Sequence, residues 1–180
     1  MPQKSDAARR PIAKNEASSP CILGLDPGLH RTGYAVMRIA PRLLLIEAGV
    51  IRILPRPELS QRLNDLYNQI SDILKEFSIS AVGVEQLYAH YLHPRTAILM
   101  GHARGVILLA AGRHGAPVTD LPSTLVKKTF TGNGHATKLQ IQRSAASRFQ
   151  LAKLPSPPDV ADAMAIGYTL AAQLRPGRRL

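Results

Sequence analysis

Four acidic residues occupy positions where strands and helices would bring their carboxylates together. Asp26 ends one apolar run and Glu85 ends another, while Asp159 and Asp162 lie three residues apart at the start of a predicted helix. Residues with that last spacing project from one helix face within a single turn. An oxygen-only ligand set suits Mg²⁺ or Mn²⁺. Two such ions about 3.5–4 Å apart can activate a water and stabilise the leaving oxygen in phosphodiester hydrolysis.

Each of these acids also has an ordinary structural explanation. Asp26 precedes a Pro-Gly pair, where an aspartate can accept backbone hydrogen bonds in an Asx-turn. Asp159 and Asp162 can interact as early-helix acids with the helix macrodipole, worth about 0.3–1 kcal/mol each. However, residues 163–167 are too apolar for a surface helix, so both aspartates are expected beside the core. Acids at three element ends in a basic protein favour a metal site.

The charge of the chain indicates a polyanionic partner. The formal net charge is +11 and the pI is near 10.4; residues 1–20 contribute +2 and residues 173–180 contribute +3, which leaves +6 for residues 21–172. Such a surplus favours nucleic acid, because each neutralised phosphate releases counterions. Cationic charge that only aids solubility is the alternative. With three Phe, five Tyr and no Trp, an aromatic platform for single strands is not expected.

The length of 180 residues fits one domain with a full core. We expect a disordered basic extension at residues 1–20, a folded domain at 21–172 and a basic tail at 173–180. The single cysteine, Cys21, rules out an internal disulfide and favours a reducing, cytoplasmic setting. No apolar run is long enough to span a bilayer, and residues 1–20 lack the apolar core of a secretory signal, so no membrane association is expected.

Hydrophobic periodicity predicts an α/β fold with a five-stranded mixed sheet flanked by helices. The expected strands are 22–26, 34–39, 43–53, 79–84 and 116–121. The expected helices are 59–77, 94–112, a short helix after Pro122, 138–149 with Thr137 as its cap, and 159–174. The first three strands can form an antiparallel meander, and strand 79–84 follows a helix as a buried parallel strand does. Its carboxyl end is where open α/β sheets place their sites.

Several short motifs carry a resemblance to a known family. They are GLDPG at 24–28 with TGY at 32–34, VEQ at 84–86, GHARG at 101–105 and DVADA at 159–163. In order and spacing over residues 21–172 they resemble the RuvC family of Holliday junction resolvases. The resemblance implies an RNase H-like fold, a homodimer, and Mg²⁺-dependent symmetric nicking of four-way DNA junctions in recombination and repair. It also implies a branch-migration helicase complex of the RuvA–RuvB type as a partner.

The resemblance implies roles for the four acids. All four acidic positions of the family's tetrad are carboxylates here, so Asp26, Glu85, Asp159 and Asp162 are expected to be catalytic. They are also the expected ligands of two Mg²⁺ ions per subunit, with Mn²⁺ able to substitute.

The resemblance also implies a set of DNA-contact residues. Tyr88 falls where the family carries an aromatic residue near the junction centre, able to stack on a base; a loop aromatic that covers the core is the alternative. Lys127 and Lys138 fall at family positions for basic residues near the site, with solvated lysines as the alternative. Arg95 and Arg143 are further candidates for backbone contact.

Two other features of the sequence have open interpretations. Gly101 and Gly105 lie on a small-residue face of the helix at 94–112, which predicts close packing against the sheet or a partner subunit. His90 and His93 can be imagined as metal ligands, but no cysteine or third histidine lies nearby, so polar loop residues are the better interpretation.

Other functions on the same fold remain alternatives. A YqgF-like RNA nuclease and an RNase H-type hybrid nuclease would use the strand-end acids equally well. A sugar-kinase or actin-like ATPase needs two such domains and a phosphate loop, for which this chain is too short. A non-cleaving junction-binding module is disfavoured by the intact set of four acids.

Overall fold

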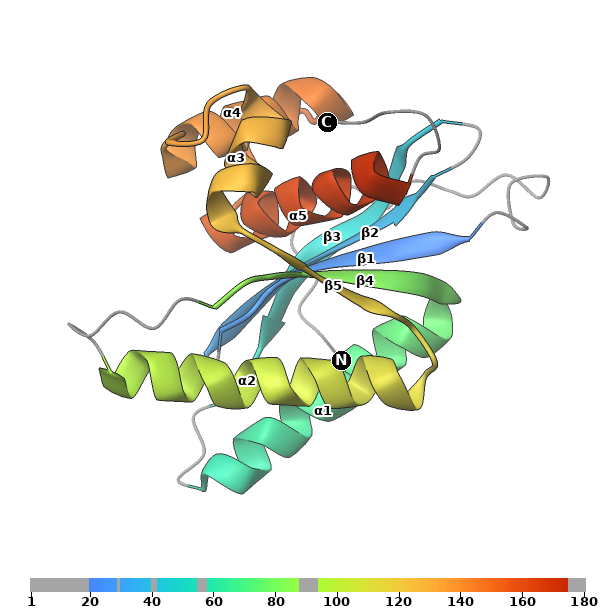
Figure 1. Ribbon diagram of the computed structural model, residues 1–180, viewed down its shortest axis with the longest axis vertical. Helices are drawn as coiled ribbons and strands as arrows, with labels where there is room; N and C mark the ends of the chain where they lie inside the picture. Colours follow the sequence, from blue (N-terminus) through green and yellow to red (C-terminus); the bar gives the residue numbers. More distant parts are fainter. Residues whose placement is uncertain (1–19, 29, 40–41, 55–57, 88–93, 175–180) are drawn as a thin grey trace.

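The computed structural model describes residues 20–28, 30–39, 42–54, 58–87 and 94–174. Figure 1 shows its helices and strands. The strands are β1 (Cys21–Asp26), β2 (Arg31–Arg38), β3 (Leu44–Arg52), β4 (Ile79–Glu85) and β5 (Val118–Leu121). The helices are α1 (Leu59–Glu76), α2 (Pro94–Arg113), α3 (Ser123–Thr131), α4 (Lys138–Phe149) and α5 (Pro158–Leu174).

The strands form one mixed sheet in the order β3-β2-β1-β4-β5. The β1–β2 and β2–β3 pairs are antiparallel, while β1–β4 and β4–β5 are parallel. This arrangement follows from the connections: only a few residues separate the first three strands from one another, whereas α1 and α2 provide the crossovers that parallel neighbours require. The predicted five-stranded mixed sheet is therefore confirmed.

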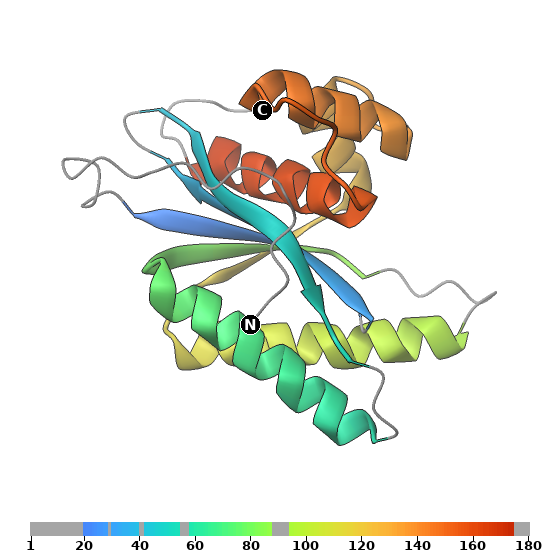
Figure 2. The ribbon, with the colours of Figure 1, turned by 180° about the vertical axis from the view of Figure 1, so that it is seen from behind.

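Helices cover both faces of the sheet. Figures 1 and 2 show α1 and α2 on one face and α3, α4 and α5 on the other. Each face has its own buried apolar cluster, one including Leu66 and Ile107 from α1 and α2, the other including Phe130 and Met164 from α3 and α5. The α5 helix lies directly on the sheet, and the side chains from Val160 to Ile166 are buried apart from that of Asp162.

Glycines in three neighbouring strands let α5 approach the sheet closely. A Cβ at Gly33 would overlap with the backbone carbonyl of Asp159, and one at Gly24 would overlap with the backbone of Ala163 and Gly167. A Cβ at Gly83 would meet only side-chain atoms, at 3.3 Å. The backbone of α5 therefore lies in the space that side chains at Gly24 and Gly33 would occupy.

Some element bounds differ from those predicted. The second strand begins at Arg31, three residues before the predicted start, because its ladder with β1 and β3 continues beyond the apolar run. The last strand begins at Val118 and α5 begins at Pro158. The predicted extension and tail lie almost wholly outside the described residues. Among the residues described, no helix is long and apolar enough to span a membrane.

Candidate active site

Asp26 and Glu85 lie at the same end of adjacent strands. The parallel register pairs Leu25 with Val84, so the next residue of each strand is the acid at its carboxyl end. Strand residues two apart share a face. Gly24 and Gly83 both face α5, so Asp26 and Glu85 project toward that helix as well. Sheet geometry thus brings together two acids that are 59 positions apart in the sequence.

Asp159 and Asp162 come from the first turn of α5, which lies across these strand ends. Gly33 pairs with Asp26 in the β1–β2 ladder and faces the Asp159 carbonyl, which places the start of α5 beside Asp26. The neighbours Val160, Ala161 and Ala163 are completely buried, and this packing fixes the helix against the sheet. The two aspartates are therefore held at the sheet, as the apolar composition of this helix predicts.

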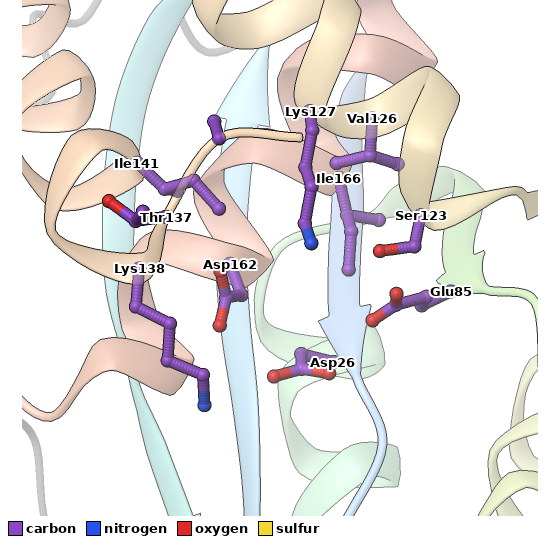
Figure 3. Close-up of a pocket in the computed structure, with 11 residues that line it drawn as sticks. Asp26, Glu85, Ser123, Val126, Lys127, Thr137, Lys138, Ile141, Asp162 and Ile166 are labelled. Carbon is purple, nitrogen blue, oxygen red and sulfur yellow. The ribbon is translucent and has the colours of Figure 1, made fainter. Parts of the chain in front are cut away.

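The acids border an open pocket of about 410 Å³ that also contains two lysines. Asp26, Glu85 and Asp162 point into the same space, and the side chains of Lys127 and Lys138 reach into it (Figure 3). Asp159 is not part of the lining. The remaining lining residues are Ser123, Val126, Ala136, Thr137, Ile141 and Ile166.

Local signals in α3 and α4 position the lysines. Gly132 ends α3 with a left-handed φ of 83°, which favours glycine, so the chain turns back after the helix that carries Lys127. Thr137 then caps α4: its hydroxyl accepts from the Gln140 backbone N–H, and the Gln140 side chain accepts from the Thr137 N–H. This capping box makes Lys138 the first residue of α4, directly over the pocket.

The electrostatics of the pocket confirm that the four carboxylates are close. Burial raises the pKa of Asp26 well above its usual range, and the charges of Asp162, Glu85 and Asp159 raise it further, while Lys138 lowers it. Burial also raises the pKa of Asp162 to about 6; Glu85 and Asp159 add to this, against lowering by Lys138 and Lys127. Burial is therefore the main cause of both raised pKa values, and at Asp26 the neighbouring acids add to it more than Lys138 offsets.

These features fit a divalent cation. All four donors are carboxylate oxygens, the ligands that Mg²⁺ prefers, and a bound cation would offset both the burial and the neighbouring negative charge that raise the aspartate pKa values. Among the described residues no three acidic, His or Cys side chains already form a ready cluster for an ion.

Asp162→Asn is expected to stabilise the metal-free protein. The pKa of the Asp162 carboxyl in the folded state is about 6, above its ordinary 3.8, so its contribution to stability is full below about pH 4 and is lost as pH rises through 6. An amide cannot ionise, and the melting temperature in EDTA at pH 7.5 should rise by about 2–6 °C, with little difference near pH 4.5.

Differential scanning fluorimetry across this pH range measures the effect. Asp72→Asn, which removes an exposed carboxylate of α1, is the matched control and should shift the melting temperature by less than about 1 °C. Equal melting temperatures for wild type and Asp162→Asn at pH 7.5 would contradict a raised pKa of the Asp162 carboxyl in the folded protein.

Two arginines that were not predicted as site residues lie near the acids: one is close to Asp159, and the other binds the backbone of Glu85. Arg31 lies near Asp159, with Nε 3.8 Å from Oδ2. Arg104 of α2 donates from Nη2 to Asp120 Oδ1 at 2.5 Å and from Nη1 to the Glu85 carbonyl at 3.5 Å, which ties α2 to the ends of β4 and β5. Arg104 lies within the GHARG motif. The place of this motif among the other family-like motifs was the only sequence feature that pointed to Arg104.

The remaining predicted DNA contacts are not gathered at the pocket. Arg143 is exposed on α4 and does not line it. Tyr88 and the side chain of Arg95 lie outside the described residues, as do His90 and His93. The roles of these residues stay predictions.

Comparison with known proteins agrees with the geometry. Residues 22–170 match the family model for the crossover junction endodeoxyribonuclease RuvC. The RuvC of Rhodopirellula baltica is 49% identical over 164 residues, covering 89% of this chain and 92% of that protein. The RuvC of Thermosipho melanesiensis is 37% identical over 86% of this chain and 98% of that protein.

Solved structures give the same result. Thermus thermophilus RuvC in complex with a Holliday junction substrate superposes with a TM-score of 0.76 at 28% identity, covering 83% of this chain and 92% of that chain. The yeast mitochondrial Holliday junction resolvase, at 12% identity and a TM-score of 0.62, shares the fold. The fold is therefore RNase H-like, as predicted, and the chain belongs to the RuvC family of crossover junction endodeoxyribonucleases.

Proposed function

We propose that this protein resolves four-way DNA junctions by symmetric, metal-dependent nicking, with Asp26, Glu85, Asp159 and Asp162 as its catalytic carboxylates. The observation that carries the proposal is the convergence of acids from β1, β4 and α5 on one pocket with two lysines. Family membership supports the activity and implies dependence on a divalent metal ion.

The four carboxylates would hold the metal, which we propose to be two Mg²⁺ ions per subunit with Mn²⁺ able to substitute. When bound, the ions supply an activated water and stabilise the leaving oxygen of the phosphodiester. The role of the chain's own residues is to hold these oxygen donors on rigid elements: two at strand ends and two on a helix fixed by buried neighbours. Rigid support keeps the reacting phosphate in line with its nucleophile.

The two lysines act on the phosphate and on the acids. Lys138 lowers the pKa of both Asp26 and Asp162, and Lys127 lowers that of Asp162, so the lysines partly offset the burial that raises these pKa values. Their ammonium groups reach the same pocket as the acids, where they can bind the scissile phosphate and offset charge that develops in the transition state. We propose that Tyr88, Arg95 and Arg143 contact DNA farther from the reacting bond.

The test is cleavage of a labelled mobile four-way junction beside linear duplex, single strand and RNA–DNA hybrid, with Mg²⁺ and with EDTA. Paired symmetric nicks on the junction alone, lost in EDTA, are the expected result. Cutting of the hybrid or of single-stranded RNA instead would overturn the resolvase assignment in favour of another nuclease on this fold.

We propose a homodimer through the outer face of α2. The inner face packs on the core through Ala103, Ile107 and Ala110. Residues at positions 98, 102, 105, 109 and 112 recur at helical spacing and are all exposed; Ile98 is 60% and Leu109 56% exposed. This α2 stripe is open, because a Cβ at Gly105 or Gly112 would meet nothing within 4 Å. We propose a second copy of this chain as the partner of the α2 stripe, because symmetric nicking needs two active sites.

Leu109→Asp is expected to convert the dimer to a monomer, because a charge at the centre of the α2 stripe cannot be desolvated without a partner. Light scattering coupled to size exclusion at about 10 μM, within the range of ordinary dimer affinities, measures the mass. Leu154→Asp, at a site 44% exposed between α4 and α5, is the control and should stay dimeric. A monomeric wild type, or a dimeric Leu109→Asp, would contradict this interface.

The cellular setting is also part of the proposal. We propose action in the cytoplasm together with a branch-migration helicase complex of the RuvA–RuvB type, because the family's members act on recombining DNA. The partnership is tested by asking whether junction cleavage and branch migration co-purify, with both activities assayed on a mobile junction.

A further inference from the structure

Two arginines lie directly opposite each other where β2 begins and β3 ends. The antiparallel register pairs Arg31 with Arg52, and both residues are exposed. Like charges directly opposite on a sheet destabilise the pair. Folding alone gives no reason for this arrangement, whereas an anion bound between them would relieve the repulsion.

Both arginines project toward the face of the sheet that carries the candidate site. Gly33, two residues after Arg31, faces the Asp159 carbonyl, and residues two apart in a strand share a face. Val50, two residues before Arg52, belongs to the apolar cluster beneath α5. Because Gly33 also pairs with Asp26, the arginines lie just beyond the acid of β1.

Arg31 keeps donors available despite its acidic neighbour. Its Nε is 3.8 Å from Asp159 Oδ2, longer than the roughly 2.7–2.9 Å of a charge-assisted hydrogen bond. The Arg31 side chain is 56% exposed. A guanidinium offers five N–H donors in a fork that matches phosphate oxygens, so Arg31 can bind a phosphate beside the pocket while it stays near Asp159.

Basic groups continue around the strand ends toward α1, but they are partly neutralised there. Arg62 Nη2 lies 3.3 Å from His30 Nδ1. Glu58 and Asp65 are close to Arg62 on the same stretch of chain, which reduces the net charge of that side. Among the residues described on the β2–β3 side of the pocket, the Arg31–Arg52 pair therefore brings two cations together at its edge.

We propose that Arg31 and Arg52 bind the phosphate backbone of the DNA strand that leaves the pocket past Asp159. This site rests on the proposed function and extends it: the lysines contact the strand on the α3–α4 side, and the arginine pair contacts it on the β2–β3 side. Contacts of this kind fix the register of the strand and read no bases. The pair thus helps to set which phosphodiester lies over the carboxylates.

The salt dependence of junction binding in EDTA tests the site, because binding there does not involve cleavage. Each lost phosphate contact lowers the slope of log K against log salt by about 0.9, so Arg31→Ala/Arg52→Ala should reduce it by about 2. The Kd at about 100 mM salt should rise by roughly tenfold. Lys75→Ala, which removes an exposed charge at the far end of α1, should leave the slope unchanged.

The other outcomes are distinguishable. An unchanged slope and Kd in the double variant would overturn the arginine site while wild-type cleavage still supports the resolvase. A fall in kcat with an unchanged slope would mean that Arg31 only pairs with Asp159 and does not contact phosphate, which would also overturn the site. A wild-type protein that fails to cut the junction would overturn the proposed function, and the slope on duplex would then test the arginines separately.

Discussion

Asp26→Asn is expected to reduce junction cleavage by at least about 10³-fold, with binding in EDTA unchanged or slightly tighter. Asp26 lies within the influence of the other three acids, because the charges of Asp162, Glu85 and Asp159 all raise the pKa of its carboxyl. Asparagine keeps the shape and one oxygen but removes the charge that would hold a cation. The basic surface that attracts DNA does not change.

Two measurements distinguish this effect from a general loss of structure. Single-turnover cleavage of a labelled junction gives the chemical step, and fluorescence anisotropy in EDTA gives binding. Asp72→Asn removes the same charge from an exposed position on α1, on the opposite face of the sheet, and should cleave at the wild-type rate. Mg²⁺-dependent cleavage retained by Asp26→Asn would contradict the assignment of the carboxylates.

The convergence of the four acids could be predicted because local sequence signals place each one. Asp26 and Glu85 each end an apolar run, and the ends of neighbouring parallel strands meet at one edge of a sheet. The apolar composition after Asp162 required α5 to be buried. None of these steps needed knowledge of side-chain positions.

Arg31 and the outer face of α2 could not be predicted in the same way. Arg31 precedes the apolar run of β2, and its place beside Asp159 depends on a ladder that continues past that run and on how α5 crosses the strand. The glycines of α2 allowed packing on the sheet or on a partner. Only the fold shows that Gly105 and Gly112 are exposed, because helix α1 and the sheet occupy the other side. Tyr88 stays a prediction.

Gly33→Ala is expected to displace the first turn of α5 and so disrupt the site without touching any acid. The added methyl group would overlap with the Asp159 carbonyl. Neither β2 nor the first turn of α5 can move easily. Strand β2 is paired with both β1 and β3, and Val160 and Ala161 of α5 are completely buried. Overpacking of this kind should cost about 2–3 kcal/mol and lower the melting temperature by about 5–10 °C. A shift of about 1 Å in Asp159 and Asp162 should reduce cleavage about 10²-fold.

Gly83→Ala is the matched control for this prediction. Gly83 lies on β4 and faces the same helix, but the atoms nearest to a Cβ there belong to the side chains of Ile166, Leu121 and Leu170 at 3.3 Å, so shifts of a few tenths of an ångström make room for it. Because the contacts at Gly83 are about 1 Å longer than those at Gly33, its melting temperature should fall by less than half as much, and cleavage should stay within about threefold of wild type. Junction binding by Gly33→Ala, measured below its melting temperature, should be retained. Equal losses in the two variants would mean that general packing of α5, and not contact between strand and helix backbones, positions the aspartates.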